Sequence, residues 1–168
     1  MRKGFTLIEL VVYIGILALI GVAAVRLILS VSFNAAEIKA ERALTASAEA
    51  AIETLTREIR QAYDVDLGAS VFGANPSTLA LKTFVSPSSP DTIVRTFSLS
   101  GSRLARQDGL APAEPITSQD VTITNLTFWH LSTATSDLIT VKMSLESGQG
   151  RFKETQTFYD STVLRSKY

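Results

Sequence analysis

The chain opens with Met1-Arg2-Lys3-Gly4-Phe5-Thr6-Leu7-Ile8-Glu9-Leu10-Val11-Val12, and from Phe5 to Val25 its only charged side chain is Glu9. At about 1.5 Å per residue, that stretch makes a helix of roughly 30 Å, which matches the hydrocarbon core of a bilayer. Arg2 and Lys3 come directly before it, so the positive-inside rule keeps the extreme N-terminus in the cytoplasm. The opening therefore predicts a single membrane-spanning helix.

An ordinary secretory signal peptide is an alternative interpretation, with a cleavage site at Gly21-Val22-Ala23. The charge of Glu9 inside the apolar stretch argues against it. So do the apolar residues that resume after Arg26 and reach Phe33, because helical periodicity then continues without a break. A plain single-span anchor, or an anchored module that binds DNA or another surface, also remains open.

The segment Gly4-Phe5-Thr6-Leu7-Ile8-Glu9 after a short basic leader resembles the prepilin processing motif of type IV pilins and type II secretion pseudopilins. The resemblance implies that a prepilin peptidase cuts after Gly4 and methylates the new amine of Phe5. It implies as partners other pilin or pseudopilin subunits and an inner-membrane assembly platform. We accordingly expect a leader at residues 1–4, a transmembrane and assembly helix at 5–33 and an extracytoplasmic domain at 34–168.

Glu9 is the candidate assembly residue. A carboxylate in lipid costs up to roughly 3 kcal/mol at mid-bilayer and usually has a partner. The resemblance implies that this partner is the N-terminal amine of Phe5 on a neighbouring subunit. The alternative is that Glu9 reaches back to the cytoplasmic interface and to the positive end of its own helix.

The second half of the helix is predicted to be amphipathic. Apolar residues recur at steps of three, four or their multiples, at Leu44, Ala48, Ile52, Leu55, Ile59 and Tyr63. The first proline is Pro76, so we expect one helix from about Phe5 to Tyr63. Its apolar first half would face lipid or neighbouring helices, and its second half would face a domain of strands.

The rest of the chain predicts antiparallel strands. They are expected at residues 78–84, 92–99, 103–107, 121–131, 138–145 and 152–159, separated by Gly, Pro, Ser or Asp. The expected core is Val121, Ile123, Leu126, Phe128, Ile139, Val141, Met143 and Leu145, with Ile52, Leu55 and Ile59 on the helix. Residues 85–90 and 108–118 are expected as exposed loops, and residues 70–77 as a turn-rich connection. The fold class is α+β, a long helix packed on a small antiparallel sheet, which is similar to the pilin fold.

Composition argues against several function classes. Lys plus Arg and Asp plus Glu are equal at 16 each, so no large charge of one sign attracts nucleic acid, and we expect no such partner. Cysteine is absent, and His130 is the only histidine, beside Trp129 in a predicted strand. We therefore expect no catalytic residues, cofactor or metal site, and a structural role for His130. Gly148-Gln149-Gly150 suits a hairpin turn better than a phosphate loop.

Three weaker hypotheses concern calcium, DNA and the type of subunit. Asp64 and Asp66 are too few ligands to predict calcium binding. A DNA-binding surface would need Lys82, Arg103 and Arg106 to converge. Degenerate segments also resemble J-type minor pseudopilins and W-type minor pilins, which implies a subunit that starts the filament or lies at its tip; the segments are Leu55 to Ala62, Ser100 to Ser102 and Pro115 to Ser118.

Overall fold

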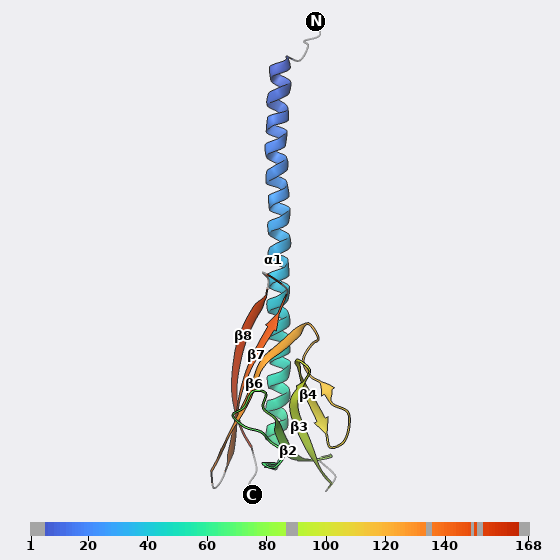
Figure 1. Cartoon of the computed structure of the whole chain (residues 1–168), viewed down its shortest axis with the longest axis vertical. Coiled ribbons are helices and arrows are strands. Elements are labelled where there is room, and N and C mark those ends of the chain that lie inside the picture. The colour runs from blue at the N-terminus through green and yellow to red at the C-terminus, as the bar shows by residue number, and fades with distance from the viewer. Residues whose placement is uncertain (1–5, 87–90, 134–135, 149, 151–152, 165–168) are drawn as a thin grey trace.

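A computed structural model describes residues 6–86, 91–133, 136–148, 150 and 153–164, without the side chain of Ala36. One long helix runs beside two antiparallel sheets (Figure 1). The elements are α1 (Leu7–Gln61), β1 (Asp64–Val65), β2 (Leu79–Phe84), β3 (Thr92–Ser100), β4 (Arg103–Asp108), β5 (Glu114–Pro115), β6 (Val121–Ser132), β7 (Asp137–Ser147) and β8 (Glu154–Val163). This α+β arrangement confirms the predicted fold class and is consistent with the pilin fold.

The predicted long helix is confirmed as a single element. Its 55 residues run from Leu7 to Gln61 with no proline to interrupt the hydrogen bonds. At Ala62 the backbone turns extended, with ψ of 143°. The next residue, Tyr63, donates its N–H to the carbonyl of Lys82 at 3.1 Å. Pairing with β2 therefore begins as soon as the helix ends.

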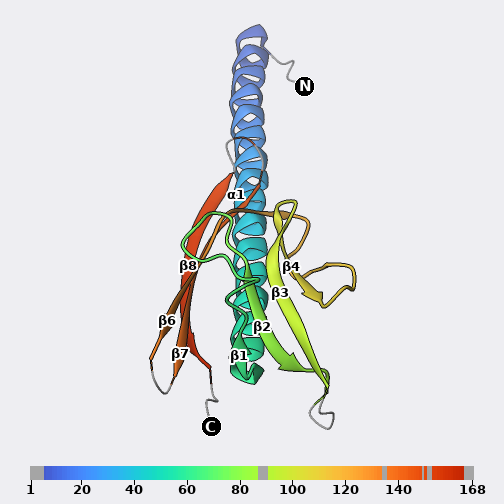
Figure 2. The same cartoon turned by 60° about the horizontal axis from the view of Figure 1, so that its bottom comes forward.

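The two sheets correct the prediction of one small sheet. The first has the order β1-β2-β3-β4-β5 and the second the order β6-β7-β8. Both lie beside the second half of α1, on different sides of it (Figure 2). One sheet was predicted because alternation within a strand does not show which strands pair with each other.

The helix buries one stripe against these sheets. The stripe starts at Ala40 and repeats every three or four residues through Ala40, Leu44, Ala48, Ala51, Leu55, Ile59 and Ala62. Four of these seven residues are alanine, whose small side chain lets the strands come close to the helix. The inner faces of both sheets supply the other side of the core, with buried apolar residues from β2, β3, β4, β6 and β7.

All eight strand residues predicted for the core are buried, from Val121 to Leu145, and so are Leu55 and Ile59. Ile52 is only partly buried, and it packs against the edge of the core. The core prediction is therefore confirmed, with Ile52 at its margin.

The loop predictions need more correction. Residues 108–118 contain β5, whose residues pair with Ala105 and Arg106 of β4. The strand β1 was not predicted. Residues 70–77 form a connection, but it pairs with other segments: Val71 forms a bridge with Thr78, and Gly73 donates to the carbonyl of Phe128 at 2.8 Å. Hydrogen bonding between chain segments distant in sequence decides these short elements, and local composition does not reveal it.

Candidate functional site: the uncovered half of the helix

The helix begins with a cap in which the Thr6 hydroxyl contacts Glu9. Thr6 has an extended backbone, and its hydroxyl oxygen accepts a hydrogen bond from the N–H of Glu9 at 3.4 Å. The hydroxyl also lies 3.5 Å from the Glu9 carboxylate. Sequence reasoning missed this cap, although a threonine followed three residues later by a glutamate is its usual pattern. Thr6 thus fixes the start of the helix and draws Glu9 to it.

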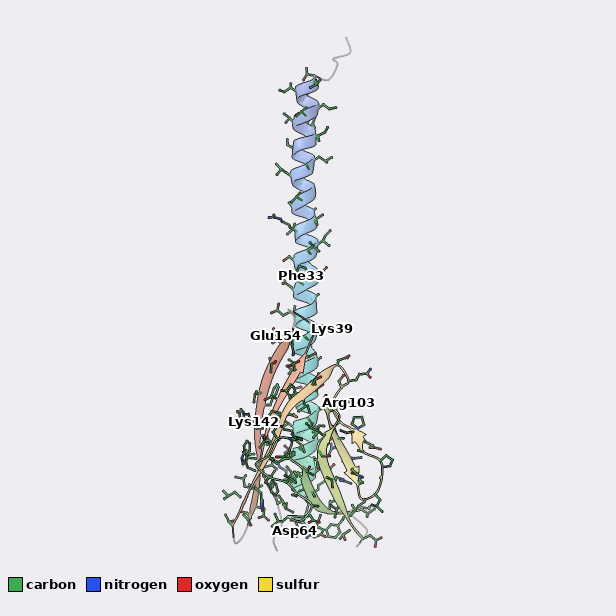
Figure 3. All side chains as sticks on the ribbon, in the orientation of Figure 1. Phe33, Lys39, Asp64, Arg103, Lys142 and Glu154 are labelled. Atoms are coloured by element: carbon green, nitrogen blue, oxygen red, sulfur yellow. The ribbon has the colours of Figure 1, made fainter. Side chains whose placement is uncertain are left out.

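The described part of the chain does not cover the first half of α1. Every described side chain from Thr6 to Lys39 is exposed, and the apolar ones surround the helix on all sides (Figure 3). Phe33 lies above the domain in this view, and Lys39 marks the level at which the strands begin. A helix that is apolar all round needs an apolar environment, either lipid or other helices.

This half contains a stretch that is long and apolar enough to cross a membrane. A signal sequence can pass the same test of length and composition. Here, however, the helix continues unbroken past Gly21-Val22-Ala23 and into the buried stripe that begins at Ala40. Cleavage at that tripeptide would cut the helix within its uncovered half.

Glu9 and Arg26 are the described charged side chains of this stretch. Both are exposed, and the contacts described for Glu9 are those with Thr6. The first turn of a helix favours a negative charge, because the free N–H groups there form its positive end. The described chain thus gives Glu9 a local cap and leaves the carboxylate accessible to an outside partner.

A buried charge network fastens the other half of the helix to the first sheet. Arg95 of β3 pairs with Glu58 of the helix and, through two hydrogen bonds of 2.7 and 3.0 Å, with Asp108 of β4. The side chains of Glu58 and Arg95 are only 6% and 15% exposed. Hydrogen bonding to the Arg95 guanidinium holds the pKa of the Asp108 carboxyl below its usual range, against the opposing effect of burial.

Sequence reasoning also missed this network, although one signal was present. Arg95 alternates with Phe97 along a strand, so the period of two places both on the face that meets the helix. The neighbouring charges extend the network toward the surface, because Arg106 lies 3.2 Å from Glu114 and 3.8 Å from Asp108.

His130 is engaged inside the domain. Its Nε2 lies 3.1 Å from the Asp137 carboxylate, and its ring stacks on Phe72 with centroids 5.3 Å apart. These contacts fit the predicted structural role. Next to it, Trp129 is 42% exposed while Phe128 is buried, as expected for neighbours on opposite faces of a strand.

The acidic and glycine-rich candidates have local partners as well. Asp64 pairs with Lys82 at 3.0 Å, and Asp66 accepts hydrogen bonds from the N–H groups of Gly68 and Ala69. Within the described residues, no group of three or more His, Asp or Glu side chains is arranged to hold a metal ion. Gly148 and Gly150 both have positive φ between β7 and β8, which suits the predicted turn; Gln149 lies outside the described residues.

The three basic residues considered for DNA binding do not share one face of their sheet. Lys82 pairs with Val94 and Arg103 with Ser100, whereas Arg106 pairs with Phe97. Because side chains alternate along β3, this register sends Arg106 to the opposite face from Lys82 and Arg103. Lys82 is also occupied by Asp64, so these residues form no common basic surface.

The residues predicted for leader cleavage, Gly4 and Phe5, lie outside the described residues, as do Arg2 and Lys3. The helix that follows them is described from its first turn, where Thr6 caps it. Cleavage between Gly4 and Phe5 would therefore leave one residue before the capping Thr6.

Comparison with known families identifies the N-terminal segment. Residues 1–25 match the family described as the prokaryotic N-terminal methylation motif. Comparisons with curated proteins and with solved structures give no match. The matched residues include the Thr6–Glu9 cap and most of the apolar stretch. The chain thus carries the prepilin-type signature of type IV pilins and pseudopilins, on a long helix packed against antiparallel sheets.

Proposed function

We propose that this chain is a minor subunit of a type IV pilus or of a type II secretion pseudopilus. The observation that supports it best is the uncovered apolar half of α1, which bears the prepilin-type signature and is continuous with a packed domain. A structural subunit needs such a helix twice, first as an anchor in lipid and then as a contact between subunits. Its partners would be other pilin or pseudopilin subunits and the assembly platform.

The proposal divides the chain into three segments. Residues 1–4 form the leader, residues 5–33 the transmembrane and assembly helix, and residues 34–168 the extracytoplasmic domain. Arg2 and Lys3 would hold the leader on the cytoplasmic side of the inner membrane. The described packing supports the second boundary, because the buried stripe begins at Ala40, shortly after residue 34.

Processing is the first test. The prepilin peptidase should remove Met1 to Gly4 and leave an N-methylated Phe5, which intact mass and N-terminal sequencing of the membrane-extracted protein would reveal. Gly4→Val should block cleavage and leave the longer chain. A mature chain that begins near Ala24 would support signal-peptide removal and overturn the proposal.

Glu9 has the proposed role of selecting the assembled state. On entering a filament, a subunit exchanges lipid for packed helices, where an unpaired carboxylate costs about a few kcal/mol. After processing removes Arg2 and Lys3, the amine of Phe5 on a neighbouring subunit is the positive group closest to this depth. Pairing of Glu9 with that amine would therefore favour assembly.

Glu9→Leu tests this role, with Glu9→Asp as the matched control that keeps the charge. The leucine variant should still insert and be cleaved, since it removes a polar group from the membrane segment. Its incorporation into sheared filaments should fall well below the wild-type level, and the aspartate variant should lie between the two. Wild-type incorporation of Glu9→Leu would show that the carboxylate has no part in assembly.

The minor role rests on the resemblance of the body segments to J-type and W-type subunits. Its test is stoichiometry: quantitative mass spectrometry of sheared filaments should find this chain at a few copies per filament beside a far more abundant subunit. If the chain forms the bulk of the filament, it is a major subunit.

A further inference from the structure

Four sheet edges are present in the described chain, and three of them are short or covered. β1 and β5, the edges of the first sheet, have two residues each, and β5 ends in Pro115. The edge of β6 is covered by the connection before β2, which donates from Gly73 to Phe128 and from Ser77 to Leu126. The fourth edge is β8, which has ten residues and pairs only with β7 among the described residues.

The register shows which backbone groups of β8 point away from β7. The N–H of Leu164 donates to the carbonyl of Asp137 at 2.9 Å, so this residue points its backbone toward the β7 side. Alternation then directs the backbone groups of every second residue away from β7. The outward set is Thr155, Thr157, Tyr159, Ser161 and Val163, and all five side chains are also exposed.

β8 has few of the features that protect exposed edges. Its sequence, Glu-Thr-Gln-Thr-Phe-Tyr-Asp-Ser-Thr-Val, has no proline, lysine or glycine, and its register with β7 is continuous over all ten residues. Asp160, an inward charge, accepts a hydrogen bond from Thr56 of the helix at 2.8 Å. Threonine, tyrosine and valine favour strand pairing.

A second copy of this chain suits this edge poorly, given the proposed membrane anchoring on which the inference rests. Antiparallel pairing of β8 with itself would point the two helices in opposite directions, and both could not enter one membrane. In parallel pairing, a residue that points at its neighbour must lie opposite one that points away. Two identical edges meet this condition only after a slip of one residue, which breaks the two-fold symmetry of a closed dimer.

We propose that β8 binds an extended segment of a different polypeptide, which adds a fourth strand to this sheet. The side chains of β8 indicate which residues this segment should contain. Glu154 and Asp160 are its only charges and face the helix side, so the partner should place basic residues there. Tyr159 and Val163 are exposed on the outer face, so the partner should place β-branched or aromatic residues beside them.

A peptide-binding measurement on the full-length protein in detergent micelles tests this edge. The probe is a fluorescent nine-residue peptide that alternates valine with lysine, and its control is a peptide of the same composition with all lysines first. The alternating peptide should bind saturably, and the control should bind at least about tenfold more weakly, equivalent to about 1.4 kcal/mol. Equal binding of the two peptides, or no saturable binding, would overturn the proposal.

Thr157→Pro and Thr157→Ala form the matched pair of variants. Both lose the hydroxyl contact with Ser144, but only proline removes the outward N–H, and that N–H makes no bond to β7. We expect the alanine variant to bind the peptide within about twofold of wild type and the proline variant at least about tenfold more weakly. Equal affinity of the two variants would contradict edge pairing.

Hydrogen exchange on the unmodified protein gives a result that needs no variant. Without peptide, the N–H groups of Thr155, Thr157, Tyr159 and Ser161 should exchange faster than those of Gln156, Phe158 and Asp160, and the peptide should slow the first set selectively. Protection of other N–H groups would show that the peptide does not bind at this edge. If the Tyr159→Cys variant assembles at the wild-type level and forms a disulfide between two copies, the edge pairs with a second copy of this chain instead. None of these measurements depends on processing at Gly4, so they can fail while the proposed function stands.

Discussion

The two halves of α1 are one continuous helix in two different environments. From Leu7 to Phe33 its large apolar side chains are exposed on every side. From Ala40 to Ala62 a stripe is buried, and the charged residues other than Glu58 are exposed. The backbone is the same in both halves, so the difference lies in the pattern of side chains. A sheet on one side would leave most of the surface of an all-apolar helix uncovered. An amphipathic helix has one apolar face, and a sheet can bury that face completely.

The two halves of the helix are expected to have different roles, the first in anchoring and the second in folding. Among the described residues, every helix residue of the hydrophobic core belongs to the packed half, and none belongs to the uncovered half. Changes in the first half should therefore alter membrane association and assembly, and changes in the second half should alter stability.

Removal of the uncovered half should have the largest effect. A chain that starts at Asn34 lacks the uncovered apolar stretch but keeps the entire buried stripe from Ala40 onward. We expect complete loss of membrane association together with a soluble, monomeric and folded domain, measured by membrane flotation, sedimentation and circular dichroism. An unfolded or aggregated fragment would mean that the first half is needed for folding.

The two halves of the helix were predictable because each depends on a pattern local in sequence. The run from Phe5 to Val25 and the repeat through Leu44, Leu55 and Ile59 need only the period of the helix. The same holds for the core residues of β7, where every second residue from Ile139 to Leu145 is apolar. In β6 the pairs Val121–Ile123 and Leu126–Phe128 follow the same period, on either side of a register shift. The prepilin-type signature is local as well, and the match at residues 1–25 agrees with it.

A pair of leucine substitutions, one in each half of the helix, should show a smaller effect that again distinguishes the two halves. Leu55 is fully buried, so Leu55→Ala should lower the free energy of unfolding by about 3 kcal/mol through lost burial and the cavity left behind. Leu19 is exposed, so Leu19→Ala should change it by less than about 0.5 kcal/mol. Urea unfolding of both variants in detergent, followed by Trp129 fluorescence, measures the comparison. Equal destabilisation would show that the first half also contributes to the domain.

The features that sequence could not predict depend on contacts between distant residues. Glu58, Arg95 and Asp108 come from three elements, and only the folded register brings them together. The division into two sheets and the position of β8 at the edge of its sheet were unpredictable for the same reason. Both depend on which strands are neighbours, and the alternation of side chains within one strand does not reveal its neighbours.

The charge network gives the next prediction within the packed half. Arg95→Met should leave Glu58 buried beside only the more distant Arg57, at 3.6 Å, and lower the free energy of unfolding by about 2 kcal/mol. Adding Glu58→Gln should recover part of this loss, because it removes the unpaired charge. Urea midpoints of the two single variants and the double variant measure the coupling. Additive losses would mean that the two side chains do not stabilise each other.

The smallest expected effect concerns pH and Asp108. Arg95 holds the pKa of Asp108 below its usual range, so the folded protein keeps this carboxylate charged at acidities where the unfolded chain, with a pKa of about 3.9, binds a proton. The resulting stabilisation is complete above about pH 4 and is lost as the pH falls through the lower folded value. The Asp108 side chain is 30% exposed, and solvent screening therefore limits the contribution to about 1 kcal/mol or less.

Asp108→Asn should lower the urea midpoint at pH 6, and the difference from wild type should shrink between pH 4 and pH 2. Asp120→Asn is the control, since Asp120 is exposed and its described hydrogen bonds use backbone atoms. A difference for Asp108→Asn that stays constant down to pH 2 would mean that the amide disturbs packing and that the charge of Asp108 contributes nothing.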